Sequence, residues 1–279
     1  MIIQNLEGKK VKEVRIPEQF NEEYHPNLIK RAVLTLQSNK RQPYGAKPKA
    51  GLRASARISK RRHDYRGCYG HGISRVPRKV TWRRGTQFGW VGAVIPGTRG
   101  GRKAHPPKAE KNWSKKINIK EKRKAIRSAM SATLNLDLVK ARNHIIPKDY
   151  PFIIESKIED SQKTKELKQI FEILGLKEEL KRVEVKKVRA GKGKSRGRKY
   201  RKKIGPLIVV SSNCKLKKAG TNIPGVEIIE VNKLNAELLA PGTQAGRLTL
   251  FTDKAIERLE KEKLFTNNPI KKEIKKVKK

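Results

Sequence analysis

The feature that most constrains this chain is a long basic segment, residues 42–109, in which no helical or strand periodicity persists. The segment holds seventeen Lys and Arg residues and eleven glycines but a single acid, Asp64. A compact domain rarely contains an irregular segment of this length unless the segment is functional or disordered. We therefore expect residues 42–111 to form an extended basic arm rather than part of a folded core.

The side chains of this arm favour nucleic acid as its partner. Arg residues outnumber Lys residues, and the rings of Trp82, Phe88 and Trp90 lie among arginines and glycines. The guanidinium group makes forked contacts to phosphate, and aromatic rings stack on the unpaired bases of folded RNA. The alternative is a disordered basic tail that attracts phosphate without regard to sequence. Such a tail would be rich in lysine and poor in tryptophan.

The net charge of the whole chain limits the classes of partner that it can bind. The formal charge is +43, from 69 basic and 26 acidic residues. A chain with this charge repels itself, so it implies an anionic partner: nucleic acid, an anionic membrane or an acidic protein. A membrane is disfavoured because the sequence has no apolar run near the roughly 18 residues of a spanning helix. We also expect no signal peptide at residues 1–5, and the two cysteines favour a reducing compartment such as the cytoplasm.

The remainder of the chain, residues 1–41 and 112–265, has the apolar and polar pattern of one globular domain, which the arm interrupts. Short apolar segments alternate in it with amphipathic helices, which predicts an α/β fold with a mostly parallel sheet covered by helices. Asn118 with Glu121 resembles a helix capping box, and Thr252 is placed to cap another helix. We expect strands near residues 11–16, 152–154, 207–210, 226–231 and 248–251, and helices at 26–36, 118–133, 165–174 and 252–259.

Two further basic segments belong to this part of the chain. Residues 191–203, in a loop at 190–204, contain eight Lys or Arg residues and no acid, and a Lys-rich tail occupies residues 266–279. Their composition favours disorder in isolation. The loop lacks the first glycine of a nucleotide-binding P-loop, where Val188 stands, and Arg196 stands where a dinucleotide-binding motif needs its third glycine. The loop is therefore interpreted as a surface that binds the RNA backbone.

Metal binding and catalysis receive little support. His63, Cys68, His71 and His105 do not show the paired short spacings of a zinc site, so we expect no metal and no cofactor. Acids such as those of the Glu178–Glu179 pair are expected on solvated helix surfaces. The chain is not expected to be an enzyme.

The candidate RNA-binding residues are the cations and rings of the arm and of the basic loop. They are Lys47, Lys49, Arg53, Arg57, Lys60, Arg61, Arg62, Arg66, Arg75, Arg78, Lys79, Trp82, Arg83, Arg84, Phe88, Trp90, Arg99, Arg102, Lys103, His105, Lys108, Lys192, Lys194, Arg196, Arg198, Lys199, Tyr200, Arg201, Lys202 and Lys203.

Five ordered motifs carry a resemblance to a known family. They are QSNKRQPYG at 37–45, GGRKAHPPK at 100–108, EKRKAIRSAMSAT at 121–133, GKGKSRGRK at 191–199 and LAPGTQAGRL at 239–248. Together they resemble the archaeal and eukaryotic branch of the fourth protein of the large ribosomal subunit, over residues 17–264. The short C-terminal tail is similar to the archaeal members.

This resemblance implies a structural ribosomal protein whose partners are large-subunit RNA, neighbouring large-subunit proteins and the nascent peptide. It implies an α/β domain at the subunit surface and an arm that reaches the peptide exit tunnel. The family's glycine-containing tip corresponds to His71, Gly72, Ile73, Ser74 and Arg75. The loop at 190–204 corresponds to an extension that contacts RNA.

Overall fold

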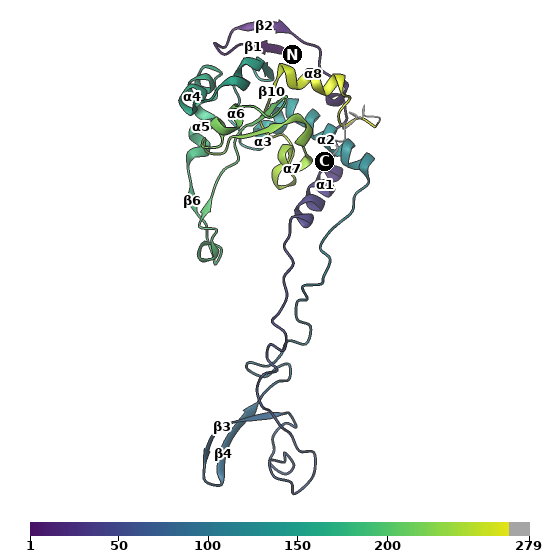
Figure 1. Cartoon of the computed structure of the whole chain (residues 1–279), viewed down its shortest axis with the longest axis vertical. Coiled ribbons are helices and arrows are strands. Elements are labelled where there is room, and N and C mark those ends of the chain that lie inside the picture. Colours follow the sequence, from purple (N-terminus) through teal and green to yellow (C-terminus); the bar gives the residue numbers. More distant parts are fainter. Residues whose placement is uncertain (268–279) are drawn as a thin grey trace, which may run out of the picture. The chain divides into compact units, whose positions relative to one another are not determined.

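The structure is a computed structural model that describes residues 1–267. Most of the Lys-rich tail predicted at 266–279 therefore lies outside the described residues. The chain divides into two compact units, each of which is described by itself (Figure 1). The sheet unit comprises Met1–Asn39 and the described part of Lys115–Lys279, and the arm unit comprises Lys40–Ser114.

The sheet unit is built on six strands in the order β2-β1-β5-β10-β8-β9. Neighbouring strands run parallel except for β2, which pairs antiparallel with β1. This arrangement confirms the predicted mostly parallel sheet. The strand expected near residues 11–16 is the antiparallel edge strand β2. The strands are β1 (Ile2–Gln4), β2 (Lys10–Glu13), β5 (Phe152–Ile154), β8 (Leu207–Val210), β9 (Glu227–Glu230) and β10 (Thr249–Thr252).

The helices lie between these strands in the chain, except α8, which follows the last of them, and they cover the sheet (Figure 1). The α-helices are α1 (Pro26–Asn39), α2 (Ile119–Leu134), α3 (Leu136–Ala141), α4 (Thr164–Ile173), α5 (Lys177–Glu184), α6 (Leu216–Gly220), α7 (Ala236–Leu239) and α8 (Asp253–Lys261). The 3-10 helices are η1 (Glu18–Phe20), η2 (Ser156–Asp160), η3 (Lys194–Arg196), η4 (Val231–Lys233) and η5 (Pro241–Thr243). Within the part of the chain that the structure describes, no helix has the length and apolar character to cross a membrane.

The hydrophobic core forms two clusters because successive side chains of a strand point to opposite faces of the sheet. In β8, Leu207 and Val209 belong to the cluster with α1, α2, α7 and α8, whereas Ile208 and Val210 belong to the cluster with α3, α4 and α6. All four side chains are buried. Continuous apolar strands are typical of parallel sheets covered on both faces. The sheet is therefore the middle layer of three.

The two predicted helix caps have different outcomes. The Thr252 side chain accepts a hydrogen bond from the Ala255 N–H at 3.3 Å, which confirms it as the cap of α8. Asn118 does occupy the N-cap position of α2, but its side chain makes no capping hydrogen bond. The capping box predicted for Asn118 and Glu121 is wrong, because Glu121 instead forms an ion pair with Arg31 of α1, with 3.2 Å between the charged atoms.

The end of α1 and the start of the chain leading to α2 are joined by hydrogen bonds. The Lys115 N–H donates to Oδ1 of Asn39 at 2.8 Å, and Nδ2 of Asn39 donates to the Lys115 carbonyl at 3.3 Å. The two places where the chain leaves and re-enters the sheet unit are therefore adjacent.

The arm unit is a chain that doubles back on itself. The Ala46 N–H donates to the Pro107 carbonyl at 2.9 Å, so the two passes lie side by side. At Gly51, which has a φ of +78°, a Cβ would lie 2.4 Å from the Arg102 nitrogen. Only glycine permits this backbone conformation together with so close an approach.

Further along the arm unit the chain forms a two-stranded hairpin, β3 (Arg78–Arg84) and β4 (Gln87–Gly92), with an irregularity between Val80 and Trp82. The sequence did not predict this hairpin. Arginines and glycines interrupt the alternation of polar and apolar residues by which a half-buried strand is detected.

Candidate nucleic-acid interface

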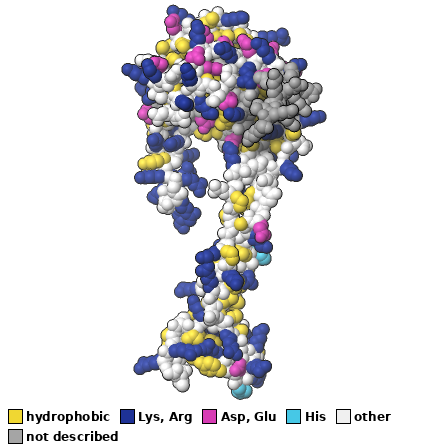
Figure 2. All heavy atoms as spheres, viewed as in Figure 1, with side chains coloured by type: hydrophobic (Ala, Val, Ile, Leu, Met, Phe, Trp, Pro, Cys, Tyr) yellow, Lys and Arg dark blue, Asp and Glu magenta, His cyan; other side chains and the backbone are white. Residues whose placement is uncertain are grey.

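The cations of the arm lie at its surface. All seventeen Lys and Arg side chains of residues 42–109 are exposed except Arg66, Arg78 and Lys79, which are half-buried. Asp64, the acid of this stretch, accepts a hydrogen bond from the Ser59 hydroxyl. That bond, aided by the charges of Arg57 and Arg61, lowers the pKa of the Asp64 carboxyl. Residues 42–109 therefore present positive charge that their single carboxylate does not neutralise (Figure 2).

A small cluster of rings gives the far part of the arm unit its shape. The Phe88 ring centroid lies 5.6 Å from that of Trp90, edge to face, and 5.8 Å from that of Tyr65. The Arg66 guanidinium lies 5.1 Å from the Tyr65 centroid, and that of Arg78 lies 5.5 Å from the Trp90 centroid. Cation–π contacts of this kind stabilise exposed surfaces by about 0.5–1 kcal/mol. Phe88 and Trp90 are half-buried as a result, and they organise this part of the arm.

Trp82 differs from the other predicted rings of the arm. Its side chain is 55% exposed, and its indole lies over Gly89, where a Cβ would come within 2.1 Å of Nε1. One face of the indole is thus supported by backbone, and much of the ring remains open to solvent. Of the three predicted stacking residues, Trp82 is the one that the structure leaves most accessible.

A second stacked group lies where the two passes of the arm unit begin and end. The rings of Tyr44 and Trp113 are stacked, with 5.8 Å between centroids and 15° between planes. The Arg41 guanidinium lies 3.6 Å from the Trp113 centroid, and the Lys111 ammonium lies 4.4 Å from it. Arg41, Lys111 and Trp113 are absent from the interface residues predicted from the sequence. The signal that marked the other residues, aromatic rings among cations, is present here as well.

The residues matched to the family's tip form an exposed loop. His71, Gly72, Ser74 and Arg75 are exposed and Ile73 is half-buried. The Arg75 guanidinium lies 4.4 Å from the Tyr69 ring centroid. Nη2 of Arg78 donates to the Ser74 carbonyl at 3.0 Å. This loop is therefore held to the start of β3.

The predicted basic loop of the sheet unit is a hairpin, although its composition favours disorder. Strands β6 (Lys187–Val188) and β7 (Tyr200–Arg201) pair antiparallel. The turn between them contains η3, and the left-handed Gly197 ends that helix. All eight cations of residues 191–203 are exposed. Figure 2 shows Lys and Arg side chains gathered over this hairpin. We call residues 185–204 the basic hairpin.

A cluster of buried and half-buried polar side chains holds the C-terminal end of the basic hairpin. Arg182, in α5, donates from Nη2 to the Ile204 carbonyl at 2.8 Å, and its guanidinium forms an ion pair with Glu179, 2.6 Å away. Glu179 also lies 2.7 Å from Nδ1 of His144 and accepts from the Ile145 N–H at 3.0 Å. Glu179 was predicted on a solvated helix surface, which is wrong. Its side chain is fully buried because these donors surround it.

The charge states in this cluster follow from their surroundings. Burial lowers the pKa of His144, and the positive charges of Arg182 and Arg142 add to that effect, so they outweigh Glu179. Burial raises the pKa of Glu179, but hydrogen bonds from Arg182 and His144 prevail and leave it below its usual value. His144 is therefore neutral beside an ionised Glu179 and donates from Nδ1.

Arg247 makes further hydrogen bonds in the same region, from the segment that leads into β10. It lies two residues before β10 and is 1% exposed. Its Nε donates to the Gly205 carbonyl at 2.9 Å, and its Nη1 contacts Glu227 at 2.7 Å and the Leu238 carbonyl at 3.0 Å. Burial and the charges of Arg247 and Arg182 lower the pKa of the nearby Arg142 to about 10. No sequence signal separates Arg247 from surface arginines, because its partners are distant in the chain.

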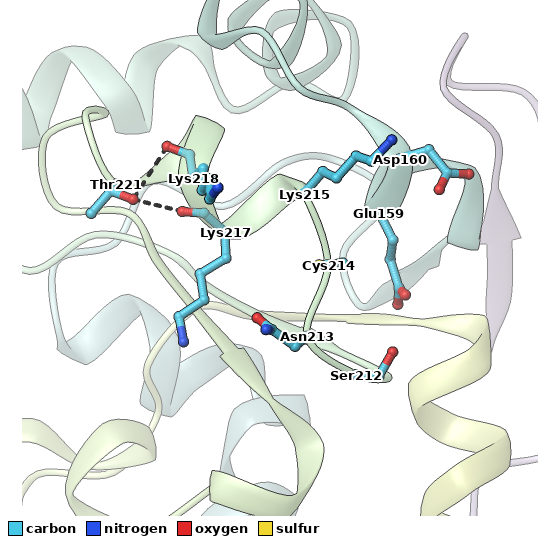
Figure 3. Close-up of a pocket in the computed structure, with 9 residues that line it drawn as sticks. All are labelled: Glu159, Asp160, Ser212, Asn213, Cys214, Lys215, Lys217, Lys218 and Thr221. Carbon is cyan, nitrogen blue, oxygen red and sulfur yellow. Dashed lines mark hydrogen bonds between the residues drawn. The ribbon is translucent and has the colours of Figure 1, made fainter.

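A hollow at the carboxyl ends of the parallel strands is the place where α/β folds commonly bind ligands (Figure 3). Its volume is about 750 Å³, and Glu159, Lys215, Lys217 and Lys218 are among the residues that line it. Glu159 accepts hydrogen bonds from the Ser211 N–H and from the hydroxyls of Ser211 and Thr252, at 2.7–2.9 Å. The buried carboxylate is thus occupied in joining the ends of β8 and β10.

The histidines and the one cysteine of the arm do not gather into a metal centre. In residues 1–267, no group of three or more His, Cys, Asp or Glu side chains is arranged to hold a metal ion. Cys68 is buried in the arm unit, and His63, His71 and His105 are exposed.

Comparison with known proteins agrees with the motifs over nearly the whole chain. The model of the ribosomal protein L4/L1 family matches residues 14–262. The large ribosomal subunit protein uL4 of Nanoarchaeum equitans is 53% identical over 262 residues, which cover 94% of this chain and 97% of the relative. The proteins of the same name from Methanocaldococcus jannaschii and Archaeoglobus fulgidus are 45% and 43% identical. They cover 93% and 91% of this chain, and 97% and 96% of each relative is matched.

Proposed function

The chain belongs to the ribosomal protein L4/L1 family, and on that premise we propose that it is a structural constituent of the large ribosomal subunit. Its partners are the ribosome and ribosomal RNA, and its place is on the ribosome. The observation that carries the proposal on this chain is the exposure of the cations of residues 42–109 around the single carboxylate of that stretch, Asp64, which is held by Ser59. Such a surface needs phosphate to neutralise it.

The proposed mechanism is physical rather than chemical. Arg and Lys side chains replace the counterions condensed between converging RNA helices, and the release of those ions favours docking. The doubled-back backbone at Gly51 keeps the two passes of the arm close enough together to enter a narrow gap. Residues 42–111 are the segment assigned to the RNA interior, and residues 1–41 with 112–265 are the domain that anchors it.

The finer assignments rest on the same family. We propose that the loop His71–Arg75 lines part of the peptide exit tunnel and faces the nascent peptide, and that the sheet unit contacts neighbouring large-subunit proteins. The exposure of His71, Gly72, Ser74 and Arg75 supports this assignment. The candidate RNA-binding cations and rings named from the sequence are proposed as RNA contacts, together with Arg41, Lys111 and Trp113. The proposed compartment is the cytoplasm.

Two other functions fit the molecule less well. A protein that condenses nucleic acid without specificity would bind DNA and RNA equally and would not depend on the aromatic rings of the arm. The ring cluster of Tyr65, Phe88 and Trp90 favours the ribosomal function, because a sequence-blind tail needs no such order. An RNA-modifying enzyme would need a catalytic or cofactor site. The buried Glu159, at the carboxyl ends of the strands, is instead engaged in structural hydrogen bonds.

Sedimentation of a lysate of the source cells through sucrose gradients tests the proposal, with the chain detected by antibody at low and at moderate salt. We expect the chain to migrate with the large subunit at both salt concentrations. Migration as free protein, or release by moderate salt, would contradict an arm that is threaded into RNA and would favour a peripheral or non-specific binder.

A further inference from the structure

The basic hairpin carries an exposed apolar pair that charge neutralisation does not explain. Val188 and Tyr200 stand directly opposite each other in the antiparallel pairing of β6 and β7. Opposite residues of such a pair project from the same face of the ribbon. Val188 is 61% exposed and Tyr200 is 46% exposed. The ribbon therefore presents one aromatic ring beside one branched aliphatic side chain.

Cations neighbour this pair in both strands. The Lys199 ammonium lies 5.5 Å from the Tyr200 ring centroid. The next pair along the ribbon, Lys187 and Arg201, projects from the opposite face. An apolar surface of another protein that covered the pair would supply no counter-charge to Lys199 beside it. A nucleotide has both a flat base for the ring and a phosphate for the neighbouring cations.

The ribbon is also held in place, as a recognition surface must be. The Arg182 guanidinium donates to the Ile204 carbonyl, and that of Arg247 donates to the carbonyl of Gly205. Toward the turn, the Arg189 N–H donates to the Lys199 carbonyl at 2.8 Å. The Tyr200 ring is thus presented on backbone fixed on both sides of it, which reduces the entropic cost of binding.

From these observations we propose that Val188 and Tyr200 form a stacking platform for one unpaired base of large-subunit RNA, with Lys199 on a flanking phosphate. The inference rests on the proposed function and deepens it, because it separates a base contact from the phosphate contacts of the remaining cations. Stacking requires the ring and not the hydroxyl, so the two parts of the Tyr200 side chain make different predictions.

The test compares the full-length chain with the variants Tyr200→Phe and Tyr200→Leu. The probes are protein-free large-subunit RNA and a single-stranded oligoadenylate of about 12 nucleotides, within the span of ordinary single-strand sites. Tyr200→Phe is expected to bind both probes within about twofold of the parent chain. Tyr200→Leu is expected to bind both roughly 5- to 150-fold more weakly, with the same salt dependence, since the charge is unchanged.

Two outcomes of these titrations would overturn the platform. One is equal affinity of the parent chain and Tyr200→Leu for both probes. The other is an equal weakening in Tyr200→Phe and Tyr200→Leu, because the hydroxyl would then be the group that binds.

Chemical probing supplies a second readout that does not depend on the affinity of the variants. Dimethyl sulfate modifies unpaired adenine and cytosine, and a carbodiimide modifies unpaired guanine and uracil. With the two reagents together, one base of the large-subunit RNA should be protected by the parent chain and by Tyr200→Phe, and become reactive with Tyr200→Leu. An unchanged reactivity pattern across the three proteins would also overturn the platform. The proposed function has its own test in the same titrations. It would be contradicted if the parent chain showed no preference for large-subunit RNA over DNA of equal length.

Discussion

Arg182 precedes the basic hairpin and Ile204 ends it, yet the guanidinium of Arg182 donates to the Ile204 carbonyl at 2.8 Å. The same guanidinium forms an ion pair with Glu179. The hairpin that carries eight exposed cations is therefore attached to the sheet unit through a buried ion pair and not through surface charge.

Replacing the buried carboxylate tests this attachment. Glu179→Gln should lower the free energy of unfolding of the sheet unit by about 3–5 kcal/mol, because Arg182 then keeps a partly buried charge without its counter-charge. Chemical denaturation measures the decrease. Glu178→Gln, an exposed neighbour in the same helix, is the matched control and should change stability by less than about 0.5 kcal/mol. Equal small effects would show that Glu179 contributes no more than a surface residue.

His144 predicts a dependence of stability on pH. The folded protein holds the pKa of His144 below the 6.5 of an exposed histidine, so the unfolded chain binds the proton first as pH falls. The parent chain should lose stability as pH drops below about 6.5, down to the folded pKa. His144→Gln should lose less over that interval, as measured by denaturant unfolding at about pH 8, 6 and 5, on both sides of the unfolded pKa. Glu179, whose folded pKa is also lowered, adds a further decrease only below 4.5. Identical pH profiles for the two proteins would contradict a buried neutral His144.

The close approach of the two arm passes predicts a specific effect at Gly51. Gly51→Ala places a Cβ 2.4 Å from the Arg102 nitrogen, so the passes must separate. Gly70→Ala is the control, because its φ is also +78° but its Cβ would meet nothing within 4 Å. Both variants carry the strain of a left-handed alanine, about 1 kcal/mol. Only Gly51→Ala should accelerate amide exchange at Ala46 and weaken binding to large-subunit RNA. The same behaviour in both variants would assign the effect to backbone strain alone.

The position of the arm's tryptophans predicts that replacing them weakens assembly into the subunit without lowering thermal stability. Trp82→Ala combined with Trp90→Ala should weaken incorporation into the large subunit while the melting temperature of the sheet unit stays unchanged. The structure supports this because the contact of Trp90 with Phe88 and that of Trp82 with Gly89 both lie inside the arm unit. Phe251→Leu, which removes the edge-to-face contact with Phe20 in the core, should instead lower the melting temperature. A collapse of thermal stability in the tryptophan variant would place these rings in the domain core.

The basic hairpin predicts a change in salt dependence. Replacing Lys199, Arg201, Lys202 and Lys203 by glutamine should flatten the log–log dependence of RNA affinity on salt, by about one unit of slope for each phosphate that the hairpin no longer neutralises. Exchanging Lys for Arg and Arg for Lys at the same positions keeps the charge and serves as the control. Fluorescence titrations over a series of salt concentrations give both slopes. An unchanged slope in the glutamine variant would show that these side chains stay solvated and neutralise no phosphate.

The sequence predicted the elements whose signal is local and repeated. Buried strands such as Leu207–Val210 are continuous apolar runs, and Thr252 caps α8 as its position before the helix suggested. The basic arm was visible because its composition differs from that of its surroundings. Elements without local repetition were missed. The strand Ile2–Gln4 contains only two apolar residues, and the helix Ala236–Leu239 has four residues, about one turn.

The buried charges escaped prediction for a different physical reason. His144 and Glu179 are separated by 35 positions of sequence, whereas Glu179 and Arg182 are separated by three, so no single period describes the cluster. A glutamate on a helix is usually solvated, and only the arrival of several donors makes its burial favourable. The same holds for Arg247, whose acceptors include Gly205 and Glu227.

The position of β10 sets the order in which this protein can be completed during its synthesis. β10 lies between β5 and β8 in the middle of the sheet, yet Thr249–Thr252 is the last of the described strands to be made. Until the ribosome has translated past residue 252, no strand joins β5 to β8. The edge of β8 that pairs with β10 in the finished sheet is then unpaired. At about 5–20 residues per second, the roughly 140 residues between the arm and the end of β10 take about 7–30 s to translate, and the basic arm is exposed for that time before the domain can close. Folding of this domain is a late event of translation, governed by a strand near its C-terminal end.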